Sequence, residues 1–130
     1  MATLLLVEDN PDKRAVLRKA FERTDHHVLD ATDGRDAVDV FIRARVDLVI
    51  VDLAMAGREG PVAIARLREL RSPAPILALA GADEADQAHE SRPASGADLR
   101  LATPFSTEEL LAGIARLLHR GSEGSSTLAG

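Results

Sequence analysis

Three acidic residues directly follow two short hydrophobic runs that have the length and composition of β-strands. Glu8 and Asp9 come after residues 3–7, and Asp52 comes after residues 47–51. In an open parallel sheet, sites form beyond the carboxyl ends of the strands, so neighbouring strands would bring these three carboxylates into one small pocket. Such a pocket suits a hard divalent cation with oxygen ligands, Mg²⁺ above all. It also leaves a carboxylate free to act as a nucleophile toward a phosphoryl group.

The elements that must position these carboxylates alternate between strand and helix patterns. The expected strands span residues 3–7, 27–31, 47–51, 76–79 and 99–101. The expected helices begin at Pro11, cover about 34–44 and 61–71, and begin again after a cap at Ser106 or Thr107. The apolar face of the first helix is expected to include Val16, and that of the second to include Ile42. This alternation predicts an α/β fold with a parallel sheet and helices on both faces.

Two segments depart from this pattern. Residues 82–98 contain no large hydrophobic residue, and a helix expected near 84–91 could bury only Ala85 and Ala88. We expect that helix to be short and weakly held, because little apolar area would dock it. Residues 121–130 are rich in Gly and Ser and lack periodicity. We therefore expect one domain over residues 1–120, followed by a flexible tail or the remnant of a linker.

Composition excludes several classes of function. The net charge of −5 argues against direct binding of nucleic acid, whose phosphates require a basic surface. With no cysteine, disulfides and cysteine–zinc sites are excluded. No apolar run approaches the ~20 residues of a membrane span, and no secretory signal is visible, so we expect a cytoplasmic protein. The histidines lack metal-ligand spacing.

A set of motifs in a fixed order carries a family resemblance. Residues 6–11 read LVEDNP, residues 31–37 read ATDGRDA and residues 47–53 read DLVIVDL, followed by Gly96-Ala97-Asp98 and Pro104-Phe105. Over residues 3–119 this order resembles the receiver domain of bacterial two-component response regulators. The resemblance implies a flavodoxin-like, three-layer, doubly wound sheet of five parallel strands in the order 2-1-3-4-5. It also implies five helices, of which the fourth is the weak one.

The same resemblance implies roles for the acidic residues. Glu8, Asp9 and Asp52 would hold Mg²⁺, and Asp52 would accept a phosphoryl group from a histidine kinase or a phosphotransfer protein. Repulsion among close carboxylates should raise pKa values in the metal-free pocket. The Thr103–Pro104 peptide bond is expected to be cis.

Three positions depart from the family pattern. Ala80 replaces a Thr or Ser whose hydroxyl binds the phosphoryl group, Thr103 replaces a Lys, and Arg100 replaces an aromatic residue. The pocket therefore lacks a hydrogen-bond donor and a cation, and the relay to an output surface is altered. Lys13, Arg58 or the hydroxyl of Thr103 could compensate.

Two functions follow as hypotheses. The first is a stand-alone, atypical response regulator receiver in a phosphorelay, with Asp52 as phosphoacceptor and a noncanonical output through a downstream protein partner. The alternative is a phosphorylation-independent pseudo-receiver that acts as a protein–protein interaction module. We do not expect an enzyme: a haloacid-dehalogenase-type phosphatase needs an Asp at position 54, which is Ala, and a flavin site needs aromatic residues that are scarce here. A monomer is expected.

Overall fold

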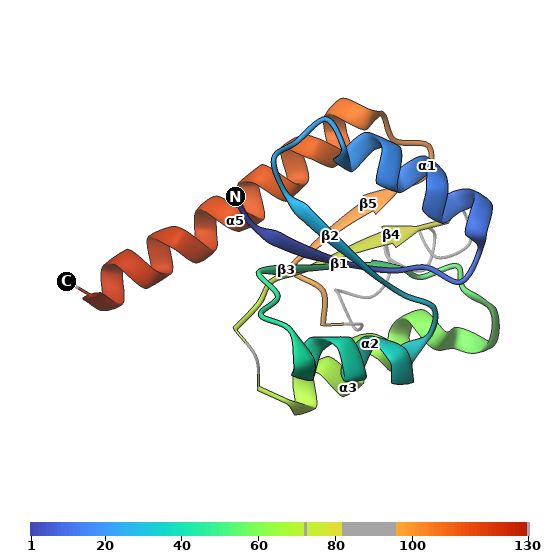
Figure 1. Cartoon of the computed structure of the whole chain (residues 1–130), viewed down its shortest axis with the longest axis horizontal. Helices are drawn as coiled ribbons and strands as arrows, with labels where there is room; N and C mark the ends of the chain where they lie inside the picture. Colours follow the sequence, from blue (N-terminus) through green and yellow to red (C-terminus); the bar gives the residue numbers. More distant parts are fainter. Residues whose placement is uncertain (72, 82–95, 130) are drawn as a thin grey trace.

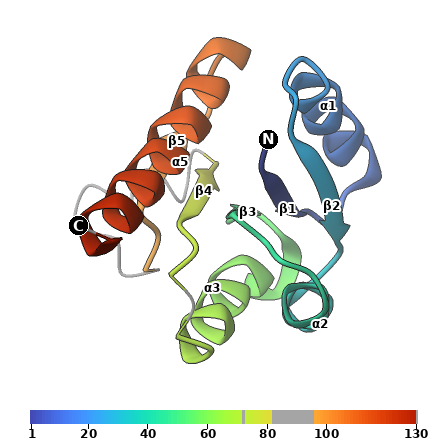
Figure 2. The same cartoon turned by 60° about the vertical axis from the view of Figure 1, so that its left-hand side comes forward.

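The structure, a computed structural model, is a twisted five-stranded parallel sheet covered by helices on both faces (Figures 1 and 2). It describes residues 1–71, 73–81 and 96–129, with side chains described through residue 119. The strands are β1 (Thr3–Val7), β2 (His27–Ala31), β3 (Leu48–Asp52), β4 (Ile76–Ala80) and β5 (Leu99–Ala102). The helices are α1 (Pro11–Phe21), α2 (Gly34–Arg43), α3 (Glu59–Glu69) and α5 (Thr107–Ala129), with a short 3₁₀ helix, η1 (Ala56–Arg58), before α3. The weak helix expected near 84–91 lies outside the described residues.

The strand order is β2-β1-β3-β4-β5, as the sequence predicted, and every neighbouring pair is parallel. This order places β1 and β3 side by side at the centre of the sheet, with Val7 opposite Val51. The residues that follow β1 and those that end β3 therefore meet at one edge. The carboxyl ends of central strands are where open α/β sheets form their sites.

Alternate residues along the strands belong to two separate hydrophobic cores, one on each face of the sheet. In β1, Leu4 and Leu6 pack with β3, β4 and α5 on one face, whereas Leu5 and Val7 pack with α2 and α3 side chains on the other. Figure 2 shows α1 and α5 on one side of the sheet and α2 and α3 on the opposite side. All four of these leucine and valine residues are fully buried, which explains why β1 is continuously apolar rather than alternating.

Local caps determine where two of the helices begin. The side chain of Asn10 accepts hydrogen bonds from the backbone N–H groups of Asp12 and Lys13, and Pro11 occupies the first helical position of α1. At α5, the Ser106 hydroxyl accepts a hydrogen bond from the Glu109 N–H, while the Glu109 carboxylate accepts one from the Ser106 N–H. This capping box confirms Ser106, one of the two expected residues, as the cap.

Several sequence-based details were wrong. Val16 and Ile42, both assigned to inward faces, are 70% and 67% exposed. The α3 helix begins at Glu59 rather than at 61, because η1 and a left-handed Arg58 lead directly into it. Asp52 is the last residue of β3 rather than the first residue after it.

Gly60 allows α3 to start close to the end of β3. A Cβ atom at this position would lie 2.6 Å from the backbone oxygen of Asp52 and 2.9 Å from the Cα of Leu53. Both distances are shorter than real Cβ contacts, and both neighbours are backbone atoms that cannot rotate away. Gly60 therefore helps to hold the backbone of Asp52 where α3 begins.

The last helix differs from expectation. The backbone is helical through Ala129, so α5 covers residues 121–129, which were predicted to form a flexible tail. In Figure 1 the C-terminal part of α5 extends beyond the sheet. The helix is therefore longer than expected, whereas the domain boundary at residue 120 and the flexibility of residues 121–130 stay predictions. None of the described helices combines the length and the apolar character needed to cross a membrane.

Candidate functional site

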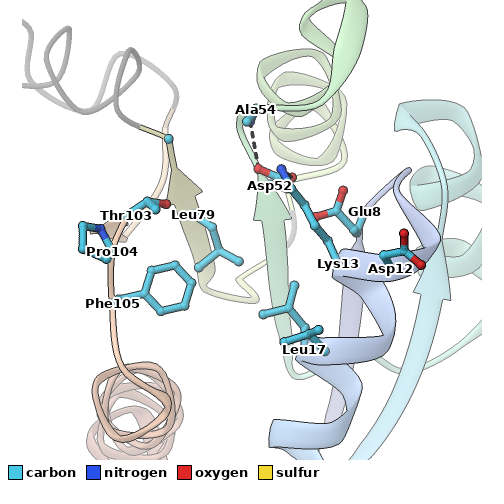
Figure 3. A pocket seen from close by; sticks show the side chains of 12 residues that line it. Glu8, Asp12, Lys13, Leu17, Asp52, Ala54, Leu79, Thr103, Pro104 and Phe105 are labelled. Carbon is cyan, nitrogen blue, oxygen red and sulfur yellow. Dashed lines mark hydrogen bonds and ion pairs between the residues drawn. The ribbon is translucent and has the colours of Figure 1, made fainter.

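Asp52 forms the floor of a cavity at the carboxyl edge of the sheet. It lies opposite Leu79 of β4 and is only 6% exposed. One carboxylate oxygen, Oδ1, accepts a hydrogen bond of 2.8 Å from the backbone N–H of Ala54 (Figure 3). This bond fixes the orientation of the carboxylate. A buried, fixed carboxylate at a strand end is a chemically useful group rather than a surface charge.

Glu8 lies beside Asp52 and is even more buried, at 1% exposure. Its backbone N–H donates to the Ala31 carbonyl, and its own carbonyl accepts from the Arg14 guanidinium at 3.0 Å. Burial, and then hydrogen bonding and repulsion between its carboxyl group and Asp52, raise the pKa of Glu8 to about 8. The Asn10 N–H, which donates to Glu8 Oε2, opposes this shift. The pKa of Glu8 is therefore raised as expected, but burial contributes more to the rise than the repulsion between carboxylates does.

Asp9 lies next to this pair but is exposed and is absent from the cavity lining. A hydrogen bond between the Asp9 and Glu8 side chains contributes to the raised pKa of Glu8. Both residues follow β1, which ends at Val7, and of the two only Glu8 is buried. Across the described residues, no group of three or more Asp, Glu, His or Cys side chains stands in a metal-binding arrangement. The role of Asp9 as a metal ligand stays a prediction.

The donor set still fits Mg²⁺. Glu8 and Asp52 offer hard carboxylate oxygens, and Mg²⁺ commonly takes one or two protein carboxylates and completes its shell with water. Two buried carboxylates facing each other repel unless a cation or a proton separates them. A divalent cation would relieve this repulsion, which adds to the effect of burial on the pKa of Glu8.

Lys13 of α1 is the cation nearest to Asp52. Its Nζ atom lies 3.7 Å from Asp52 Oδ2. Figure 3 shows the lysine side chain extending from α1 toward the Asp52 carboxylate. From the sequence, Lys13 was only one of three groups, with Arg58 and the Thr103 hydroxyl, that could compensate for the missing donor and cation. Spacing alone does not reveal which way a long side chain turns.

The cavity has a volume of about 510 Å³ and continues from the carboxylates into an apolar groove. Its lining comprises Glu8, Asp12, Lys13, Val16, Leu17, Asp52, Ala54, Leu79, Gly81, Thr103, Pro104 and Phe105. Asp12, in the first turn of α1, lines the cavity although the sequence analysis did not single it out. Its place in the first turn of a helix that starts at this edge of the sheet could have indicated from the sequence that it lies near the site.

The three departures from the family pattern lie at or beside this edge. Ala80 is buried at the end of β4, and its carbonyl accepts a hydrogen bond of 2.8 Å from the Thr103 N–H. Thr103 lines the cavity, and its peptide bond to Pro104 is cis, as expected. Arg100 lies in β5, half-buried, and its Nε atom has no hydrogen-bond partner within the described part of the chain.

Comparison with known proteins identifies the family. A model of the response regulator receiver domain matches residues 4–115. The chain belongs to this family. It is 30% identical over 122 residues to the transcriptional regulatory protein ResD of Bacillus subtilis, covering 94% of this chain and 50% of that protein. It is 35% identical over 117 residues to the response regulator MprA of Mycolicibacterium vanbaalenii, covering 90% and 50%. The chain is therefore a response regulator receiver domain of two-component signalling, and it spans about half the length of these relatives.

A solved receiver domain supports the comparison at the level of structure. The receiver domain of the sensor histidine kinase PA1611 from Pseudomonas aeruginosa superposes with a TM-score of 0.79 at 29% identity, covering 91% of this chain and 98% of that one. That receiver domain is described with a magnesium ion coordinated in its active-site cleft.

Proposed function

We propose that this receiver domain is a Mg²⁺-dependent phosphoacceptor and that Asp52 is the acceptor. The observation that carries the proposal is the fixed, buried Asp52 carboxylate, which opens onto the cavity beside Glu8. Membership in the receiver family and the magnesium site of the PA1611 receiver domain support it.

The reaction is a nucleophilic displacement at phosphorus. A carboxylate oxygen of Asp52 attacks the phosphorus atom, and the bond from phosphorus to the leaving group breaks as the new O–P bond forms. With a phosphohistidine donor, the leaving imidazole nitrogen keeps the bonding electron pair. With acetyl phosphate, acetate leaves. The product is an acyl phosphate on Asp52, and no oxidant or reductant is needed.

The carboxylates would hold Mg²⁺ beside the acceptor. The proposed ligands are the buried Glu8 and Asp52, together with the exposed Asp9 beside them. Held there, Mg²⁺ would supply positive charge to offset the negative charge of the phosphoryl group during its transfer to Asp52. Loading the ion requires the proton on Glu8 to leave, because a protonated carboxyl group is a poor ligand.

The partners follow from this chemistry. The phosphoryl donor would be a histidine kinase or a phosphotransfer protein, and the output would pass to a downstream protein by direct contact. Relatives such as ResD are named transcriptional regulators and are about twice as long as this chain. The acidic net charge of −5 favours a protein rather than a nucleic acid as the direct partner of the residues described.

A pseudo-receiver that works without phosphorylation is the second candidate. It is favoured by Ala80, whose buried methyl group replaces a hydroxyl donor, and by Thr103, which brings no positive charge to the cavity. In that case the surface would bind a partner whether or not Asp52 is modified.

Intact-mass spectrometry after incubation with acetyl phosphate tests the proposal. We expect a phosphoryl adduct on the wild-type protein in the presence of Mg²⁺, none after chelation of the metal, and none on Asp52→Asn. An equal adduct on Asp52→Asn would show that another group reacts. No adduct on any protein would favour the pseudo-receiver.

A further inference from the structure

The phosphoacceptor site lacks a positive charge at the position where the family resemblance places a lysine. Thr103 occupies that position at the end of β5. A transferring phosphoryl group carries negative charge on three oxygens, and its transfer depends on positioning and charge neutralisation. A site with only carboxylates and a neutral Thr103 would leave this charge to Mg²⁺ alone.

Lys13 reaches this site from a different element. Its Nζ atom lies 3.7 Å from Asp52 Oδ2, and among the described residues that line the cavity it is the only one with a positive charge. The lysine side chain is 56% exposed at the rim, whereas the Asp52 side chain is almost fully buried. The ammonium group therefore stands between solvent and the acceptor carboxylate, on the side from which a phosphoryl group would approach.

The start of α1 holds Lys13 in this place. The backbone N–H of Lys13 donates to the Asn10 side chain at 3.2 Å, so the residue lies in the capped first turn of the helix. The cap fixes the backbone of Lys13. Its side chain is still free to move between two hydrogen-bond acceptors, the Asp52 carboxylate and a phosphoryl group bound to it. A flexible four-carbon stem that ends in a compact charge is suited to this movement.

The other candidate cations near this edge do not fit. Arg58 is exposed and does not line the cavity. Arg14 also lies outside the lining, and its guanidinium donates to the Glu8 backbone carbonyl. Of the cations considered, only Lys13 is therefore placed to contact a group bound at Asp52.

We propose that Lys13 replaces the missing lysine of the phosphoacceptor site. In the unmodified protein its ammonium pairs with Asp52. When a phosphoryl group is transferred to Asp52, the ammonium moves outward and donates hydrogen bonds to phosphoryl oxygens. No proton is transferred in this exchange, and Lys13 remains charged throughout. The inference rests on the proposed function, because it needs Asp52 to be the acceptor.

The chain provides its own matched control. It contains two lysines, Lys13 and Lys19, and both lie on α1. Lys19 is exposed and does not line the cavity. Replacing either residue with Met removes one positive charge from the same helix and keeps the length of the side chain. Exposed ion pairs contribute little to stability, so both variants should fold, which circular dichroism can verify.

The experiment follows the rate of adduct formation with acetyl phosphate and Mg²⁺ by intact mass. We expect Lys13→Met to slow the reaction about tenfold, less than the loss of a fully buried oxyanion donor because Lys13 is partly exposed. Lys19→Met should match the wild type. Lys13→Arg should retain part of the rate, because a cation remains. Adding Thr103→Lys to Lys13→Met should restore the rate by returning a cation to the cavity from β5.

A second readout is independent of turnover. Beryllofluoride binds carboxylates as a mimic of a phosphoryl group. In Mg²⁺ and beryllofluoride, labelling of Lys13 by an amine-reactive ester should slow several-fold, while labelling of Lys19 in the same molecule should not change.

The outcomes separate the two proposals. If the wild type and Lys13→Met form the adduct equally fast, or if Lys13 is labelled equally with and without beryllofluoride, the role of Lys13 is overturned while Asp52 stays the acceptor. If no variant forms an adduct, including the wild type, the proposed function fails and the role of Lys13 fails with it.

Discussion

At the scale of single residues, the site is an electrostatically unfavourable pair with a cation at its rim. Glu8 and Asp52 are both buried and adjacent, and Lys13 is 3.7 Å from Asp52. Two facing carboxylates in the interior lower the stability of the fold at neutral pH. In return, they form a group that can bind a cation or react. The cost should be visible in the dependence of stability on pH.

The Glu8 proton makes stability fall as pH rises. The pKa of Glu8 is about 8 in the folded protein against an ordinary value of 4.5. Between these values the folded state holds a proton that the unfolded state has released, so the free energy of unfolding decreases with rising pH. In Mg²⁺-free buffer, Glu8→Gln should lack this decrease. Relative to the wild type, it should gain on the order of a few kcal/mol between pH 5 and pH 8.

Urea unfolding at several pH values measures this difference. The exposed residue Glu22, at the end of α1, provides the control Glu22→Gln, which should follow the wild type. Parallel stability curves for Glu8→Gln and the wild type would contradict the account of the buried pair.

The meeting of Glu8 with Asp52 could be predicted from the sequence, whereas the conformation of Asp9 and Lys13 could not. Strand ends are marked by the change from apolar to acidic residues, and parallel neighbours bring such ends together. Which of two successive carboxylates is buried depends on the conformation of the loop that follows β1. The direction of the Lys13 side chain depends on rotamers that only the packed helix determines.

At the scale of elements, the close approach of α3 to β3 fixes the backbone of Asp52, the proposed acceptor. Gly60→Ala would place a methyl group 2.6 Å from the Asp52 carbonyl oxygen. We expect a loss of about 1–3 kcal/mol in the free energy of unfolding, typical of overpacking, together with slower phosphorylation of Asp52.

Gly113 of α5 is the matched control for Gly60. A Cβ atom there would lie 3.1 Å from the tip of the Leu99 side chain, which can move. Gly113→Ala should cost less than Gly60→Ala, and the better helix propensity of Ala would offset part of that cost. Thermal unfolding of both variants tests this order, and the reverse order would contradict the proposed role of Gly60.

The cap of α1 connects helix stability to the site. Asn10→Ala removes the acceptor for two N–H groups and should cost about 1 kcal/mol of stability. It should also slow adduct formation, since Lys13 lies in the capped turn. Asn10→Asp keeps a side-chain acceptor and is the control. If Asn10→Ala unfolded at the same urea concentration as the wild type, the cap would have no measurable role.

Most element boundaries were predictable because their signals are local. Asn10-Pro11 and the Ser106–Glu109 pair mark helix starts within four residues of sequence. Val16 and Ile42 were placed wrongly because periodicity gives the direction of an apolar face and not how much of it the neighbouring elements cover. The start of α3 was missed because a left-handed non-glycine residue, Arg58, has no sequence signature.

At the scale of the whole molecule, two cores on the two faces of one sheet hold the site at their common edge. The fold was predictable since strands and helices alternate in order and the family motifs occur at the right spacing. The length of α5 was not, because Gly and Ser in residues 121–129 disfavour a helix that the structure nevertheless continues.

Binding of Mg²⁺ at this edge should stabilise the whole domain. A ligand that binds only the folded state adds about 2.7 kcal/mol at a concentration one hundred times its dissociation constant. We expect MgCl₂ to raise the thermal midpoint of the wild type more than NaCl of equal ionic strength does. Asp52→Asn should lose most of this difference. An equal response of the two proteins to Mg²⁺ would place the ion elsewhere.

The central claim, that Asp52 carries the phosphoryl group, is tested most directly by mapping the modified residue. Borohydride reduces an acyl phosphate on Asp to homoserine, and peptide mass spectrometry then locates the change. After treatment with acetyl phosphate and Mg²⁺, we expect homoserine at position 52 and at no other Asp. Reduction at a different residue, or none in a protein that binds Mg²⁺ at this edge, would contradict the claim.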